Sequence, residues 1–108
     1  VPFKDVIATG TCLQNLRTSS LNNSMCLTRD GYHMDYGISR YAAACMMFEK
    51  LISPSFDNVK LDTNAYRYNV SNTTSGSYST PVTDANAPIA LQAARYALET
   101  PYVVTNMK

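Results

Sequence analysis

The chain has 108 residues, 45% hydrophobic and 16% charged, a balance typical of a small globular domain that buries about two thirds of its surface. The formal net charge is only +1 and the nine basic residues are scattered, which excludes a basic stripe for nucleic acid or for an anionic membrane. No apolar run approaches the ~20 residues of a membrane-spanning helix, and one histidine with three cysteines offers too few ligands to predict a metal centre.

The N-terminal segment predicts a strand followed by a short helix. Residues 5–8 form a short apolar run before a Thr-Gly pair, which is typical of a buried parallel strand and too short for a helix. Thr11 and, three residues later, Gln14 fit a capping box, which predicts a helix over residues 12–18. Because the strand has no sheet to join in this chain, we expect its apolar face to need a cover from another chain.

The middle of the chain predicts a turn that leads into the longest helix. Residues 30–33, Asp-Gly-Tyr-His, are typical of a tight turn because Asp-Gly tolerates the left-handed backbone that a reversal needs. From about Tyr36 onward, apolar side chains recur at helical spacing, which predicts a helix with one buried face that is stopped by Pro54. The residues of that face are Ile38, Tyr41, Ala42, Cys45, Phe48 and Ile52.

The turn holds the only histidine, His33, three residues after Asp30. A carboxylate at this spacing can fold back on the imidazole, fix its tautomer and stabilise the imidazolium that forms in general-base catalysis. Asp35 is a second candidate partner for the histidine and also a candidate cap for the helix. Arg17 and Arg29 are candidates for binding a carboxylate or a substrate anion near the turn. The pattern thus predicts two thirds of a hydrolytic triad.

The Asp-Gly-Tyr-His block at residues 30–33, followed by a glycine and by the helix segment 40–45 (R-Y-A-A-A-C), resembles the last sequence block of the SGNH, or GDSL-like, hydrolase superfamily. Residues 7–18 also look like the segment before that block in a branch described only as a domain of unknown function. The resemblance implies an α/β fold, flavodoxin-like with three layers, of which this chain supplies the last strand and mostly helices. It also implies that Asp30 and His33 are the acid and base of a Ser-His-Asp triad.

The blocks that carry the family's nucleophilic serine and oxyanion-hole residues have no counterpart in this sequence. Ser19, Ser20 and Ser39 are near the turn in sequence, but none sits in a strand-to-helix elbow that would expose its hydroxyl. Cys26 is an alternative nucleophile that the spacing leaves open. We therefore expect the chain to be the C-terminal portion of a larger hydrolase domain and to lack esterase activity alone, because the largest catalytic contributions are missing.

The second half of the chain predicts a long loop and a final helix. Residues 54–83 have little periodicity, and the tyrosines within residues 66–78 suggest at most one short strand or an extended arm. Asp84 or Asn86 can cap a final helix that runs to about Glu99. The many alanines of that helix allow close packing, and we expect part of its apolar face to be left exposed in this chain.

We expect one domain over residues 1–108, with the Asp/His pair in residues 1–53 and the loop and C-terminal helix in residues 54–108. The resemblance implies ester hydrolysis through an acyl-serine, a small-molecule or carbohydrate ester as substrate, no cofactor, and the missing N-terminal part or another chain as partner. Abundant Asn, Ser, Thr and Tyr favour an extracytoplasmic location, periplasmic or secreted. The rival prediction is a non-catalytic helical interaction module in which the turn is only structural.

Overall fold

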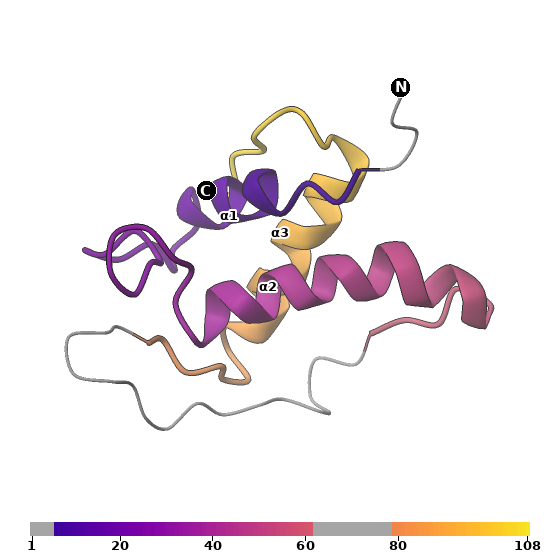
Figure 1. Ribbon diagram of the computed structural model, residues 1–108, viewed down its shortest axis with the longest axis horizontal. Coiled ribbons are helices and arrows are strands. Elements are labelled where there is room, and N and C mark those ends of the chain that lie inside the picture. Colours follow the sequence, from indigo (N-terminus) through magenta and orange to yellow (C-terminus); the bar gives the residue numbers. More distant parts are fainter. Residues whose placement is uncertain (1–5, 62–78) are drawn as a thin grey trace.

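The computed structural model of the protein describes residues 6–61 and 79–108, which fold around three α-helices (Figure 1). These helices are α1 (Thr9–Arg17), α2 (Ile38–Met47) and α3 (Ala87–Glu99). α2 continues into a π-helical segment, η1 (Phe48–Ile52), and then a 3-10 turn, η2 (Ser53–Phe56), so that one long rod forms the lower layer of Figure 1. α3 crosses this rod and also packs against α1. The described part of the chain is therefore helical.

The predicted strand at residues 5–8 is wrong for its described residues, 6–8, which have no strand geometry and lead directly into α1. Their carbonyl groups serve the start of the helix, because the oxygen of Ile7 accepts from the N–H of Thr9 at 2.9 Å and that of Ala8 from Cys12 at 3.0 Å. A strand needs a neighbouring strand for these same groups, and residues 6–61 and 79–108 contain none.

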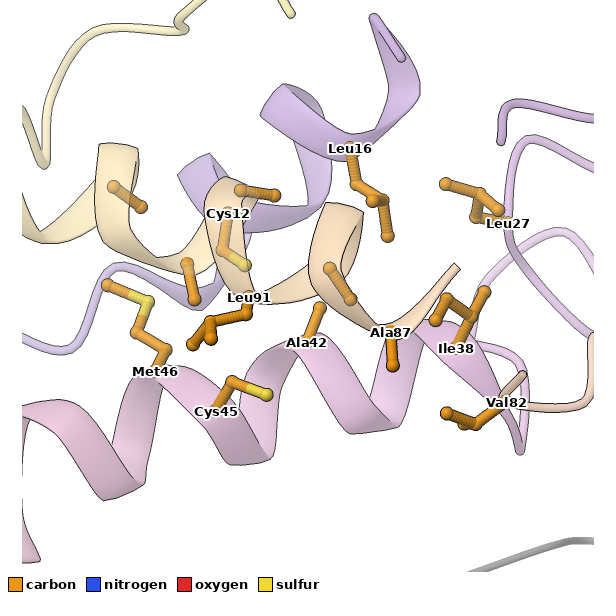
Figure 2. Packing of buried hydrophobic residues seen from close by; sticks show 14 residues of the cluster. Cys12, Leu16, Leu27, Ile38, Ala42, Cys45, Met46, Val82, Ala87 and Leu91 are labelled. Carbon is orange, nitrogen blue, oxygen red and sulfur yellow. The ribbon is translucent and has the colours of Figure 1, made fainter. Parts of the chain in front are cut away.

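The core lies where the three helices meet, and it includes the whole alanine-rich face of α3 (Figure 2). Ala90, Ala93, Ala94 and Ala97 are completely buried in it. The prediction that this face would be left exposed is wrong. Small side chains let the backbone of α3 approach α1 and α2 closely, so the chain covers the face itself. Larger side chains fill the space around the crossing; they are Cys12, Leu16, Leu27, Ile38, Cys45, Met46, Val82 and Leu91.

The C-terminal tail folds back along α1. Its backbone N–H groups donate to polar side chains of that region and not to a neighbouring strand. Asn15 is completely buried and accepts the N–H of Thr105 at 2.7 Å while its amide donates to the carbonyl of Ala93 at 3.2 Å. Thr18 accepts the N–H of Met107 at 2.8 Å. One buried asparagine thus joins α1, α3 and the tail, and an apolar substitution there would leave buried backbone groups without partners.

α3 has the predicted boundaries, beginning after Asn86 and ending at Glu99, whereas α1 begins three residues before the predicted residue 12. α1 begins at Thr9, and Thr11 does not cap it, since its hydroxyl donates to the carbonyl of Pro101 at 2.6 Å. α3 begins after Asn86, one of the two predicted caps. Asn86 and Thr83 form a reciprocal pair in which each side chain accepts the other's N–H, at 2.7 and 3.1 Å. This is the geometry of a capping box placed one turn before the helix.

No helix among the described residues is long and apolar enough to cross a membrane. The tyrosine-containing stretch at residues 66–78, which the sequence suggested as a short strand or arm, lies outside the described residues.

Candidate active site

The turn at residues 30–33 is the tip of a small antiparallel loop just before α2. Thr28 and Met34 form a single antiparallel bridge, and the N–H of Arg29 donates to the carbonyl of His33 at 3.0 Å. Gly31 at the tip has a φ of 94°, a conformation that side chains with a Cβ rarely adopt. The Asp-Gly pair therefore supplies the reversal that the sequence predicts, and the loop presents its polar tip to solvent.

Within this tip the structure brings Asp30 and His33 together. Oδ2 of Asp30 lies 2.6 Å from Nδ1 of His33, while Oδ1 accepts the N–H groups of Tyr32 at 2.9 Å and of His33 at 2.8 Å. The carboxylate is thus fixed by the backbone through one oxygen and holds the imidazole through the other. The ring orientation follows from the turn itself, since every contact spans three residues or fewer.

The electrostatics of the pair define which imidazole nitrogen carries the proton. Hydrogen bonds from the backbone and ring of His33, and from the backbone of Tyr32, hold the pKa of Asp30 well below its usual range. The carboxylate is therefore ionised at neutral pH and can only accept, so a neutral imidazole paired with it carries its proton on Nδ1. Nε2 is then the basic nitrogen, as in a histidine that is oriented by an aspartate for general-base catalysis.

The basic side of the imidazole is accessible. The side chain of His33 is 63% exposed, and in the described part of the chain no group is bonded to Nε2. Here one nitrogen is fixed and the other is open to a reacting group.

The base of the loop is fixed by buried polar side chains at the start of α2. Oδ1 of Asp35 accepts the N–H groups of Gly37 at 2.9 Å and Ser39 at 3.2 Å, and the hydroxyl of Ser39 donates to the carbonyl of Leu27 at 2.7 Å. Burial raises the pKa of Asp35, and these N–H groups together with Thr80 oppose that rise. Of the two roles that the sequence left open for Asp35, the structure shows the helix cap; Asp30 is the partner of the histidine.

The turn is connected with the side of α2 by contacts among Arg29, Tyr36 and Arg40. Nε of Arg29 lies 3.9 Å from Oδ2 of Asp30, and its Cζ lies 4.4 Å from the ring centre of Tyr36. The Cζ of Arg40 lies 4.5 Å from the same ring. The pairing of Tyr36 with Arg40 is not among the contacts predicted from the sequence, although a spacing of four residues at a helix start is a signal for contact. Arg17, the other predicted anion ligand, instead donates to the carbonyl of Cys26 at 2.8 Å.

The serines near the turn have structural partners. Ser39 is buried and its hydroxyl donates to the carbonyl of Leu27, and the hydroxyl of Ser19 donates to the carbonyl of Leu16 at 2.6 Å. Ser20 is exposed in the loop after α1 and is not on a strand-to-helix elbow. None of these three serines has the environment of a nucleophile, as the sequence analysis expects.

The cysteines divide into two buried thiols and one exposed thiol. Burial raises the pKa of Cys12 to about 12 and that of Cys45 to about 11, so both remain protonated and unreactive at neutral pH. Cys26 is exposed next to the loop. No group of three or more His, Cys, Asp or Glu side chains that could hold a metal ion occurs in residues 6–61 and 79–108.

A family model matches residues 1–84, and the chain belongs to that family, which is described as Domain of unknown function (DUF4886). The match includes both α1 and the whole loop with Asp30 and His33. No curated protein and no solved structure matches the chain.

Proposed function

We propose that this chain provides the acid and base of an SGNH-type serine esterase, with His33 as the general base and Asp30 as the residue that orients it. The observation that carries the proposal is the 2.6 Å contact between Oδ2 of Asp30 and Nδ1 of His33 on an exposed, backbone-fixed turn. The resemblance of the Asp-Gly-Tyr-His block to the last block of the superfamily supports the same roles. The nucleophilic serine belongs, in this proposal, to another segment of the complete hydrolase domain.

The proposed chemistry uses the two imidazole nitrogens for different tasks. Nε2 of His33 takes the proton of the serine hydroxyl as its oxygen attacks the ester carbonyl, and the imidazolium then gives that proton to the leaving alkoxide. The ionised carboxylate of Asp30 stabilises the imidazolium and keeps the ring from turning. Water then attacks the carbonyl of the acyl-serine while His33 takes its proton, and the imidazolium returns that proton to the serine oxygen as the acid leaves.

The complete domain would have the three-layered, flavodoxin-like α/β fold of the superfamily, and the helices described here would cover one part of its sheet. We further propose an ester of a small molecule or a carbohydrate as the substrate and an extracytoplasmic location. The composition and the resemblance support both points, and the site requires no cofactor for this reaction.

The test is covalent labelling of the complete polypeptide that contains this chain with a fluorophosphonate, which reacts with activated serines. We expect labelling that disappears in His33→Ala, weakens in Asp30→Asn and is unchanged in Asp57→Asn, which removes an exposed carboxylate far from the turn. The labelled peptide should lie outside residues 1–108. Labelling that is equally strong in His33→Ala, or absent from a folded wild-type protein, would contradict the proposal.

The rival function is a non-catalytic interaction module, which is favoured by the apolar side chains that η1 and η2 expose. Leu51 is 56% exposed and Phe56 is 66% exposed. Exposed apolar groups that cluster on one surface are typical of sites where proteins associate. The labelling experiment separates the two functions, because a module without catalytic activity has no serine that depends on His33.

A further inference from the structure

A hollow of about 320 Å³ lies beside α2. Its inner wall is apolar and includes Ala44, Cys45, Phe48, Leu61 and Val82. Its size corresponds to roughly ten water-sized groups, which is the scale of a benzoyl or octanoyl group. A concave apolar site with a few polar groups at its edge is the usual form of a small-molecule site.

The edge of the hollow carries positive charge. Tyr36 and Arg40 line it, and the guanidinium of Arg40 stacks on the Tyr36 ring, with Cζ 4.5 Å from the ring centre. Within residues 6–61 and 79–108, Arg40 has this ring and no carboxylate as a partner. A guanidinium fixed on a ring keeps its outer N–H groups available for a carboxylate and loses little side-chain freedom on binding.

The hollow is connected to the turn by direct contacts. The other guanidinium, that of Arg29, lies 4.4 Å from the Tyr36 ring centre and its Nε lies 3.9 Å from Oδ2 of Asp30. The Tyr36 ring therefore lines the hollow and also contacts Arg29, whose guanidinium approaches the carboxylate of Asp30. A ligand that contacts the Tyr36 ring would thus be linked to Asp30 through Arg29.

We infer that this hollow binds the apolar acyl group of a carboxylic acid or its ester, with the carboxyl end at Arg40. The inference deepens the proposed function by naming the acyl part of the substrate: a group of benzoyl to octanoyl size that fills the hollow. It rests on the proposed function only for the statement that the ligand is a substrate or product, because binding itself requires neither the serine nor turnover.

The test is a titration of the isotopically labelled chain with benzoate and with benzamide, which have the same shape and differ in charge, followed by NMR. We expect saturable shifts at Ala44 and Val82 with benzoate and binding of benzamide at least about tenfold weaker, because the neutral amide cannot form a charged hydrogen bond with Arg40. Shifts that never saturate, or equal binding of the two probes, would overturn the inference.

Two variants and their matched controls complete the test. Ala44 is exposed on α2 at the hollow, so Ala44→Phe should fill the space and abolish benzoate binding without loss of folding. Arg40→Gln should weaken benzoate about tenfold and leave benzamide unchanged. The controls Gln14→Phe and Lys108→Gln change exposed residues outside the hollow and should bind like the wild type.

These outcomes are independent of the hydrolase proposal. Benzoate binding by the wild type together with fluorophosphonate labelling unaffected by His33→Ala would retain the hollow as a binding site and reject the esterase. The reverse result would retain the esterase and place its acyl site elsewhere. Benzoate binding that persists unchanged in both Ala44→Phe and Arg40→Gln would overturn the inference directly.

Discussion

The two ends of the long rod formed by α2, η1 and η2 are built in opposite ways. At its start, Asp35 and Ser39 are buried and hydrogen-bonded, and the loop before them carries an exposed polar tip. At its far end, η1 has no buried residue, and the π-helical and 3-10 segments expose Leu51 and Phe56. Polar groups lie inside at one end, and apolar groups lie outside at the other.

This difference indicates which end of the rod holds its side chains in fixed positions. Burying a carboxylate costs free energy, and that cost is offset only when its oxygens receive N–H groups in fixed positions. At the start of α2, Oδ1 of Asp35 receives two such N–H groups, which fix the base of the turn that carries Asp30 and His33. At the far end, Glu49 accepts one N–H group of Arg95 at 3.0 Å and the hydroxyl of Ser53 donates to the carbonyl of Val59 at 2.7 Å. Leu51 and Phe56 are nevertheless exposed there, a surface suited to being covered rather than to positioning a reacting group.

The largest difference between the two ends should appear in catalysis by the complete polypeptide. His33→Ala is expected to lower kcat/KM for a short-chain ester by at least about 10³-fold, because the proposed general base is lost. The exposed position of His33 predicts an unchanged thermal midpoint. Asp57→Asn, beyond the far end, should keep full turnover, and an active His33→Ala enzyme would show that the turn is only a scaffold.

Stability should respond strongly to the loss of the buried cap. Asp35→Ala leaves the N–H groups of Gly37 and Ser39 without their acceptor, which should lower the free energy of unfolding by about 2–3 kcal/mol. Leu51→Ala at the far end should change it by less than about 0.5 kcal/mol. Urea unfolding measures both values, and equal effects would contradict the contrast between the ends.

A pair of glycines offers a sharper stability comparison. A Cβ on Gly37 would collide with the carbonyl of Thr80, which also accepts the N–H of Ile38 at 2.9 Å, whereas a Cβ on Gly10 in α1 meets nothing within 4 Å. We expect Gly37→Ala to destabilise the fold by about 1–3 kcal/mol. Gly10→Ala should stabilise it by up to about 1 kcal/mol, because alanine favours a helix. Thermal unfolding of the two variants should therefore shift in opposite directions.

The smallest expected effect is the contribution of Asp30 to stability in acid. Its folded-state pKa is lowered, so the carboxylate stabilises the fold above its ordinary pKa of 3.8 and this contribution is lost as the pH falls below that value. The raised pKa of Asp35 acts in the opposite direction. Asp30→Asn leaves Asp35 in place and should reduce the loss of stability between about pH 4 and pH 2. An identical acid limb in the variant would contradict the pair's geometry.

The sequence predicts most of the helical path and the turn, because both depend on contacts between near neighbours. Asp30 and His33 interact over three residues, and the apolar spacing correctly predicts the burial of Ile38, Ala42 and Cys45. Ile52, predicted on the same buried face, is instead 45% exposed. The strand predicted at residues 5–8 is wrong for residues 6–8 because an apolar run does not reveal which groups its carbonyls will meet. Asn15 depends on partners 78 and 90 residues away, and the burial of α3 depends on α1 and α2, which lie far earlier in the chain; no local pattern contains these contacts.

The central claim is that the turn fixes His33 with its proton on Nδ1 and its Nε2 free. Long-range ¹⁵N NMR of the labelled chain, at a pH where the ring is neutral, reports which nitrogen carries the proton. We expect the Nδ1–H tautomer in the wild type and its loss in Asp30→Asn, with the backbone spectrum otherwise preserved. A ring that carries its proton on Nε2, or that is identical in the two proteins, would contradict the claim.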